Sequence, residues 1–180
     1  PDYVTSIGGS AFSGCSSLTS VIWNAKICRG AGSEDYPIFY DCSELSSITI
    51  GENVKTIPAY AFYCCGRITS VTIPDGVTSI GERAFGYCLS LTSVTIGNGV
   101  TSIGSSAFCD CSSLKTVFYK GTAKQWKEIS IDYNYNLTNA ARYYYSETEP
   151  ALNSDGTAYN GNYWHYDTDG KTPVIWKKEN

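Results

Sequence analysis

The sequence contains no methionine, one histidine and few charged residues, and each of these shortages argues against a class of structure or function. Without Met even at residue 1, the chain is predicted to be a processed or trimmed piece that has lost any signal peptide or wall anchor. The 13 Lys and Arg are outnumbered by 17 Asp and Glu, and the longest basic feature is Lys177-Lys178, which argues against nucleic acid as a partner. No apolar run approaches about 18 residues, so no membrane span is predicted.

Candidate catalytic and metal-binding groups are equally scarce. His165 is the only imidazole, and a Cys/His dyad would need a thiol beside it, which nothing in the sequence arranges. A structural zinc site needs four converging ligands, yet the only C-x-C pair is Cys109 and Cys111. The acidic residues form no glycosidase-like pair. Residues 167–170 resemble part of a calcium loop without its closing Glu, which favours a hairpin turn. We therefore predict no enzyme, no cofactor and no metal.

What the sequence has instead is an internal repeat. Five Phe residues each stand three residues before a Cys, at successive steps of 27, 23, 23 and 23 residues. The pairs are Phe12/Cys15, Phe39/Cys42, Phe62/Cys65, Phe85/Cys88 and Phe108/Cys111. A fixed period of about 20–50 residues predicts a stacked array, in which each unit buries its apolar face against its neighbours.

The clearest unit spans residues 77–96 and reads VTSIGERAFGYCLSLTSVTI. Its apolar or small positions are Val77, Ile80, Ala84, Phe85, Cys88, Leu91, Val94 and Ile96. The end of the unit, L-x-x-V-x-I, alternates as a short strand does, and turn residues follow it. In the next unit, residues 107–111 fit one inward-facing helical turn. Each unit therefore predicts one coil: strand, turn, short strand, turn, short helix, turn.

The repeated phrase SIGxxAFxxCSSLTSVTIP resembles the BspA-like leucine-rich repeats of bacterial surface proteins over residues 3 to about 119. Residues 120–180 resemble the segment that closes such arrays in gut Gram-positive bacteria, through YKGTAKQWKEISI, ARYYYSETEP and GNYWHYDTDGKTPVIW. The resemblance implies a secreted or wall-attached protein, often linked to adhesion.

The predicted fold is an α+β repeat solenoid. It is a right-handed leucine-rich-repeat array with short parallel strands in each coil and a C-terminal β-rich cap. Residues 1–119 are expected to form about five coils of period 23, and residues 120–180 an aromatic-rich capping segment. In that segment Thr122 is expected to cap a short helix carrying Trp126 and Ile129. Residues 163–166 and 174–176 are expected to form a hairpin.

One coil departs from the period, because four extra residues lie between Trp23 and Phe39. We expect them to bulge as a loop at one edge of the stack. An insertion of this kind can also be a binding site, and both interpretations stay open. The first coil begins without the strand that should precede it, so we also expect an exposed N-terminal edge that tends to self-associate.

The eight cysteines divide into two groups. The five in the Phe/Cys pairs share one inward repeat position and are expected to be buried free thiols, because stacked side chains that point the same way bridge poorly. Cys28, Cys64 and Cys109 lie off that column, Cys64 at a more exposed position, and their redox state stays open.

Two surfaces are candidates for ligand binding. The strand residues beside the inward Val face the concave side, and the candidates there are Ile22, Thr49, Thr72, Thr95 and Phe118, next to a second column of Ser20, Ser47, Ser70, Ser93 and Thr116. The cap offers the aromatic residues Tyr163, Trp164 and Tyr166, which could stack on sugar rings. Both sets also have a structural interpretation, because Thr favours strands and aromatic residues close an array.

These features lead to three hypotheses. The first is a non-enzymatic adhesion module, extracellular or on the cell surface, that binds a protein or glycan of a host or neighbouring cell. The second is a structural spacer or display stalk without a ligand of its own. The third is a thiol enzyme, which needs a reactive cysteine.

Overall fold

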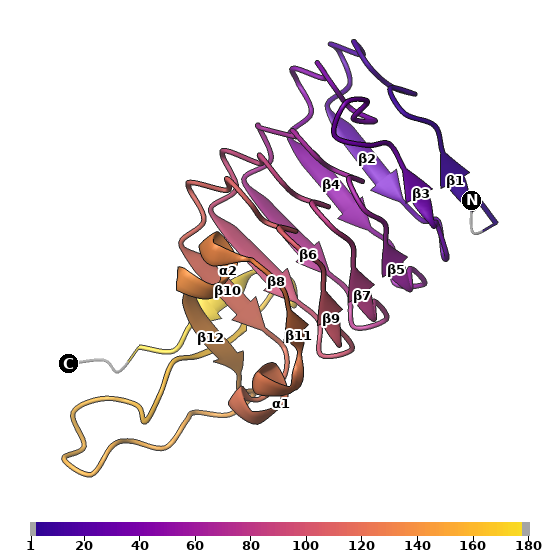
Figure 1. Cartoon of the computed structure of the whole chain (residues 1–180). Coiled ribbons are helices and arrows are strands. Elements are labelled where there is room, and N and C mark those ends of the chain that lie inside the picture. The colour runs from indigo at the N-terminus through magenta and orange to yellow at the C-terminus, as the bar shows by residue number, and fades with distance from the viewer. Residues whose placement is uncertain (1–2, 178–180) are drawn as a thin grey trace.

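The computed structural model describes residues 3–177, which form a β-solenoid of about seven coils (Figure 1). Longer strands line one side of the coils and two-residue strands line another. The longer strands are β2 (Ser20–Trp23), β4 (Ser47–Ile50), β6 (Ser70–Ile73), β8 (Ser93–Ile96), β10 (Thr116–Tyr119) and β12 (Ala141–Tyr145). The short ones are β1 (Ser6–Ile7), β3 (Gly30–Ala31), β5 (Thr56–Ile57), β7 (Ser79–Ile80), β9 (Ser102–Ile103) and β11 (Ser130–Ile131). We number coils 1 to 6 by the longer strand that ends each of them.

Equivalent residues of successive coils lie side by side, as the 23-residue period predicts. Strands β6, β8 and β10 pair in parallel, with Ser70 opposite Ser93 and Ser93 opposite Thr116. Behind them the rings of Phe62, Phe85 and Phe108 stack with centroids 5.3 and 5.2 Å apart, and all three rings are fully buried. The continuous hydrophobic core expected from the repeat is therefore confirmed.

The side of the coil that carries Phe is not helical, in contrast to the expected helical turn. Some of its N–H groups bond to the next coil: Phe62 donates to Ala84 O and Phe85 to Ala107 O, both at 2.8 Å. Others close tight turns within the segment, as Gly86 does by donating to Arg83 O at 3.0 Å. Arg83 and Tyr87 adopt positive φ angles of 48° and 57°, which no helix allows. Turns and bonds between coils therefore take the place of the helical turn.

The array continues past the five coils that the Phe/Cys pairs mark. Strand β11 pairs with β9, and β12 pairs with β10, so residues 120–145 add a sixth, irregular coil. The helices α1 (Ala123–Glu128) and α2 (Tyr135–Asn139) lie in this coil, and the helix content is otherwise low. Thr122 caps α1 through a reciprocal box with Gln125, as expected. The division of the chain at residue 119 stays a prediction.

The extra residues of coil 2 shift the strand register and do not form a simple loop. Toward coil 1, Gly30 lies opposite Ser6; toward coil 3, Ile27 lies opposite Thr56. In the regular coils, Ser6 and Thr56 hold the same repeat position. Coil 2 therefore pairs with its two neighbours through different residues, and a bend over residues 34–36 takes up the remaining length.

Residues 163–175 form the predicted hairpin. Strand β13 (Tyr163–Tyr166) extends the sheet by pairing in parallel with β12, and β14 (Pro173–Ile175) returns antiparallel to it. Gly170, with φ of 65°, lies in the turn, where its N–H donates to Asp167 O. Asp169 accepts the N–H groups of Lys171 and Thr172, both at 2.8 Å. The carboxylate of Asp169 therefore organises the turn.

Asp169 gives this turn a pH dependence. Hydrogen bonds from the Thr172 side chain and from two backbone N–H groups lower its pKa to about 2, whereas an Asp of an unfolded chain titrates near about 3.9. A depressed pKa stabilises the turn above pH 4 and loses that contribution as the pH falls toward 2. We expect the Thr172 amide NMR signal to titrate with a midpoint near pH 2, and Asp169→Asn to abolish that titration. A midpoint near pH 4 would contradict these bonds.

Candidate functional site

The concave face is open at its N-terminal half and covered at its C-terminal half. The hairpin β13–β14 lies over β8 and β10, so Thr95 is only 4% exposed and Phe118 9% exposed. The ring of Phe118 packs on Trp164 at 5.4 Å. In contrast, Ile22 is 71% exposed, and Thr49 and Thr72 face solvent. Of the five candidates on this face, three are accessible, and the expectation of an open surface at Thr95 and Phe118 is wrong.

A polar clasp holds the hairpin in place. Lys120 follows β10, and its Nζ lies 2.5 Å from Asp75 Oδ2 and 5.7 Å from the ring centroid of Tyr166. Burial lowers the pKa of Lys120, but the bonds to Asp75 and Tyr166 outweigh it and raise that pKa overall. Lys120 therefore stays charged and links β10, the loop before β7 and the hairpin.

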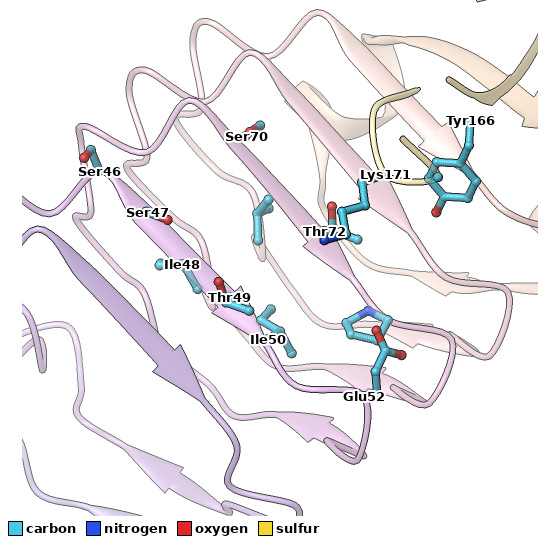
Figure 2. Close-up of a pocket in the computed structure, with 13 residues that line it drawn as sticks. Ser46, Ser47, Ile48, Thr49, Ile50, Glu52, Ser70, Thr72, Tyr166 and Lys171 are labelled. Atoms are coloured by element: carbon cyan, nitrogen blue, oxygen red, sulfur yellow. The ribbon is translucent and has the colours of Figure 1, made fainter. Parts of the chain in front are cut away.

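Next to this hairpin, the concave face has a groove between β4 and β6 (Figure 2). Its volume is about 540 Å³. Figure 2 shows β4, with Thr49, on one side and Lys171 and Tyr166 of the hairpin toward the other. The groove is lined by Ser46, Ser47, Ile48, Thr49, Ile50, Glu52, Ser70, Val71, Thr72, Pro74, Tyr166, Gly170 and Lys171. Strands β4 and β6 belong to different sheets, so the groove lies at a break in the array.

The chemistry of the groove suits hydrogen bonding to a polar ligand. Five Ser and Thr hydroxyls line it, each able to donate and accept. Glu52 and Lys171 add one charge of each sign, so the lining has no strong net charge. Burial raises the pKa of Tyr166, which keeps its hydroxyl neutral. Such a lining can hold an extended polar chain, and it pairs no nucleophile with a base.

The aromatic candidates of the cap have mainly a structural role. Trp164 is fully buried, its Nε1 donates to Tyr119 O at 3.0 Å, and it therefore cannot stack on a sugar. Tyr163 and Tyr166 are half-buried, and only Tyr166 reaches the groove. Sequence reasoning missed Glu52, Asp75 and Lys171. Glu52 and Asp75 lie one period apart and are both acidic, so the repeat carried a signal for them, whereas Lys171 lies outside the repeat.

His165 packs as a hairpin residue. Its ring lies 4.3 Å from that of Trp176, and its Nδ1 is 2.8 Å from Tyr166 O. The interpretation of this histidine as a packing residue is therefore confirmed. In residues 3–177 no three His, Cys, Asp or Glu side chains converge as a metal site would require. None of the helices in that range has the length and apolar character needed to cross a membrane.

Three of the five column cysteines donate a hydrogen bond to the preceding coil. Cys42 Sγ lies 3.1 Å from Phe12 O, Cys88 Sγ 3.4 Å from Phe62 O, and Cys111 Sγ 3.1 Å from Phe85 O. Cys65, Cys88 and Cys111 are buried, Cys42 is half-buried, and Cys15 at the first coil is exposed, so burial of the whole column is wrong. Of the cysteines off the column, Cys28 is buried and the other two are half-buried.

Thiol reactivity should follow this burial. Burial raises the pKa of Cys65, and the thiolate is the form that attacks iodoacetamide and displaces its iodide. We expect iodoacetamide at pH 8 to alkylate Cys15 at the rate of an ordinary thiol, and Cys65, Cys88 and Cys111 at least about tenfold more slowly. Peptide mass spectrometry gives each rate, and urea-unfolded protein, in which all eight should react, is the control. A buried cysteine reacting faster than Cys15 would revive the thiol-enzyme hypothesis.

Comparisons with known proteins agree with this architecture. The model of the BspA type leucine rich repeat region matches six copies, over residues 1–115 and 35–138. A comparison with curated proteins found no match. Among solved structures, the chain is similar to a leucine rich cell surface protein of Faecalibacterium prausnitzii, with 32% identity and a TM-score of 0.61 over 72% of this chain and 33% of that one.

Two further structures share the fold. A leucine-rich repeat protein of Bacteroides ovatus is 25% identical with a TM-score of 0.55, over 80% of this chain and 40% of that one. The leucine rich repeat protein of T. pallidum is 25% identical with a TM-score of 0.53, over 79% of this chain and 67% of that one. The chain thus spans only about a third to two fifths of the first two proteins.

Proposed function

Because the chain belongs to the BspA-type leucine-rich repeat family, we propose that it is a non-enzymatic interaction module, extracellular or on a bacterial surface, that binds a protein or glycan through the open half of its concave face. The observation that carries this proposal is the groove between β4 and β6. It exposes hydroxyls of β4 and β6 where the hairpin leaves the face uncovered. Similarity to a cell surface protein of Faecalibacterium prausnitzii supports the location.

The ligand surface of this proposal comprises Ile22, Thr49 and Thr72, joined by Lys171 at the hairpin tip. Solenoids bind extended ligands on such faces because the stacked coils repeat the same polar groups at regular intervals. The half-buried Tyr166 adds an aromatic edge, as expected of sites that contact sugars or peptides. Thr95 and Phe118 are not part of this surface while the hairpin covers them.

The experiment is a binding screen with a matched pair of variants. The chain is applied to arrays of glycans and of extracellular matrix proteins, and each hit is measured again with Thr49→Arg and Ser112→Arg. Thr49 lines the groove, whereas Ser112 is exposed in a turn outside it. We expect Thr49→Arg to weaken binding at least about tenfold, because an arginine fills the groove and displaces hydrogen bonds, and Ser112→Arg to leave it unchanged.

The alternative function, a spacer or display stalk, makes the opposite prediction. If the folded protein bound nothing on either array, the result would favour the spacer. Equal loss of binding in both variants would indicate that the ligand binds outside the groove. The same screen is repeated with the Asp75→Asn variant, which removes the charge that holds Lys120. Stronger binding by this variant would indicate that the hairpin limits the length of the ligand surface.

A further inference from the structure

Three of the six prolines occupy positions at which other coils donate a backbone N–H to a neighbouring coil. Pro74 stands directly after β6, where Gly97 donates to Ile73 O at 2.8 Å and Lys120 to Ile96 O at 2.9 Å in later coils. Pro58 stands after β5, where Gly81 donates to Ile57 O at 2.8 Å. Proline has no N–H, so neither bond can form toward coil 2.

Pro37 removes the third bond from the opposite side of the same junction. It stands two residues before Phe39, and the equivalent Tyr60 donates forward to Glu82 O at 2.9 Å. Tyr60, Arg83 and Ser106, which share this position, all have positive φ angles between 48° and 58°. A proline ring fixes φ near −65°, so Pro37 cannot adopt the turn of the other coils. All three prolines are buried, and all three act between coils 2 and 3.

Two of these positions also control how closely coils approach. A Cβ on Gly81 would lie 2.4 Å from the backbone N of Ala59, and one on Gly97 would lie 2.6 Å from Pro74 C. Coils 4 and 5 can therefore pack tightly on their predecessors only because glycine is present there. Pro58 and Pro74 hold the same two repeat positions one period earlier, where coil 3 faces coil 2, and place a bulkier ring there.

The structure shows the consequences along the whole junction. Within residues 3–177 no backbone hydrogen bond joins β4 to β6, whereas β2–β4, β6–β8 and β8–β10 are all paired. The rings of Phe39 and Phe62 are 6.1 Å apart, against 5.2 to 5.5 Å for the other neighbours in the column. The bond from a column cysteine to the preceding Phe carbonyl recurs at the other described junctions of the column and has no counterpart from Cys65.

One corner of the junction remains joined. Lys55 N–H donates to Lys26 O at 2.9 Å, and Ile27 pairs with Thr56 next to it. The ion pair of Arg67 with Glu44 also spans the junction, but both side chains are more than half exposed, and pairs of that kind add little stability. Other side-chain links cross it as well, from Thr56 Oγ1 to Cys28 O at 3.4 Å, from Arg67 Nη1 to Ser43 O at 2.9 Å, and between Arg83 and Glu34. The backbone bonds between coils 2 and 3, in contrast, are confined to one corner.

We propose that this junction is a hinge encoded by Pro37, Pro58 and Pro74. Coils 1 and 2 turn as one rigid unit against coils 3 to 6, about the corner formed by residues 26–27 and 55–56. This motion widens or narrows the groove between β4 and β6, while the fully paired strands on either side keep their shape. The hinge follows from the backbone alone and does not depend on any ligand.

Amide hydrogen exchange followed by NMR tests the hinge in the unmodified protein. We expect the amides of β4 and β6 that face the junction to exchange at least about tenfold faster than their equivalents in β8 and β10. Because the hairpin covers β8 and β10, the amides of β4 that pair with β2 serve as the matched reference, since β4 and β6 read SITI and SVTI and share one burial pattern. Equal protection on both sides of the groove would overturn the proposal.

A triple variant tests the role of the prolines. Pro37→Ser, Pro58→Gly and Pro74→Gly place at each position a residue that another coil already has there, namely Ser10, Gly81 and Gly97. We expect the restored donors to close the ladder and to slow exchange in β4 and β6 by about tenfold or more. Unchanged exchange in the folded variant would show that the prolines do not encode the break. Should the triple variant fail to fold, Pro74→Gly alone, which restores one donor to Ile50 O, is expected to protect the adjacent amide.

Discussion

Replacing Phe85 by Ala is expected to lower the free energy of unfolding by about 3–5 kcal/mol. The ring is fully buried between Phe62 and Phe108, with centroids 5.3 and 5.2 Å away, so its removal leaves a cavity that neither neighbour can fill without breaking its own stack. Because each coil of a solenoid is stabilised by its neighbours, the cavity weakens the junctions on both sides of coil 4. Urea unfolding followed by circular dichroism measures the loss.

Phe12 provides the matched control for this prediction. It holds the same repeat position in coil 1 but is 42% exposed, and it stacks on one ring only, that of Phe39 at 5.5 Å. Phe12→Ala should cost about 1 kcal/mol, in proportion to the smaller area that it buries. Equal losses in the two variants would mean that the rings do not share a continuous interior, and the stacked architecture would then be wrong.

The sequence predicted those parts of the molecule that repeat. A residue one period away occupies the same environment, so the inward Phe, the parallel pairing of β6, β8 and β10 and the core positions followed from spacing alone. The hairpin turn at residues 167–170 was also predictable, because local turn chemistry encodes it. Neither inference needed knowledge of which distant segments meet.

What the sequence did not show is where non-repeating segments dock. That the hairpin covers Thr95 and Phe118 depends on contacts between residues 120–177 and coils formed far earlier in the chain. The clasp of Lys120 with Asp75 joins neighbouring repeat positions two coils apart, because Lys120 follows β10 as Pro74 follows β6. The period does not place the hairpin, however, so the accessible half of the concave face could be identified only from the structure.

The break between coils 2 and 3 is an intermediate case. Its signal is present in the sequence, since Pro58 and Pro74 replace glycines that recur one period later. The meaning of those prolines becomes clear only when the backbone bonds of the regular coils are known. The four extra residues identify coil 2 as irregular in the sequence. The altered register is visible only in the structure, where Gly30 and Ile27 pair with different neighbouring coils.

Trp164→Ala is expected to detach the hairpin and to lower the free energy of unfolding of the capped array by about 3–5 kcal/mol. The indole is fully buried, with Phe118, Tyr145 and Tyr166 packed around it at 4.9 to 5.4 Å, and its Nε1 donates to Tyr119 O. Its loss should expose Phe118 and Thr95 and move Lys171 away from the groove. Hydrogen exchange in β10 and a thermal melt together report both effects.

Trp164→Phe separates the ring from the hydrogen bond in this prediction. It keeps an aromatic side chain in the pocket but leaves the carbonyl of Tyr119 without its donor, which should cost about 1–3 kcal/mol and leave the hairpin in place. The two variants therefore differ in whether β10 becomes accessible. If Trp164→Ala left exchange in β10 unchanged, the hairpin would be held by the clasp of Lys120, Asp75 and Tyr166 instead of by the buried indole. In that case Asp75→Asn, and not the change at Trp164, would uncover the rest of the concave face.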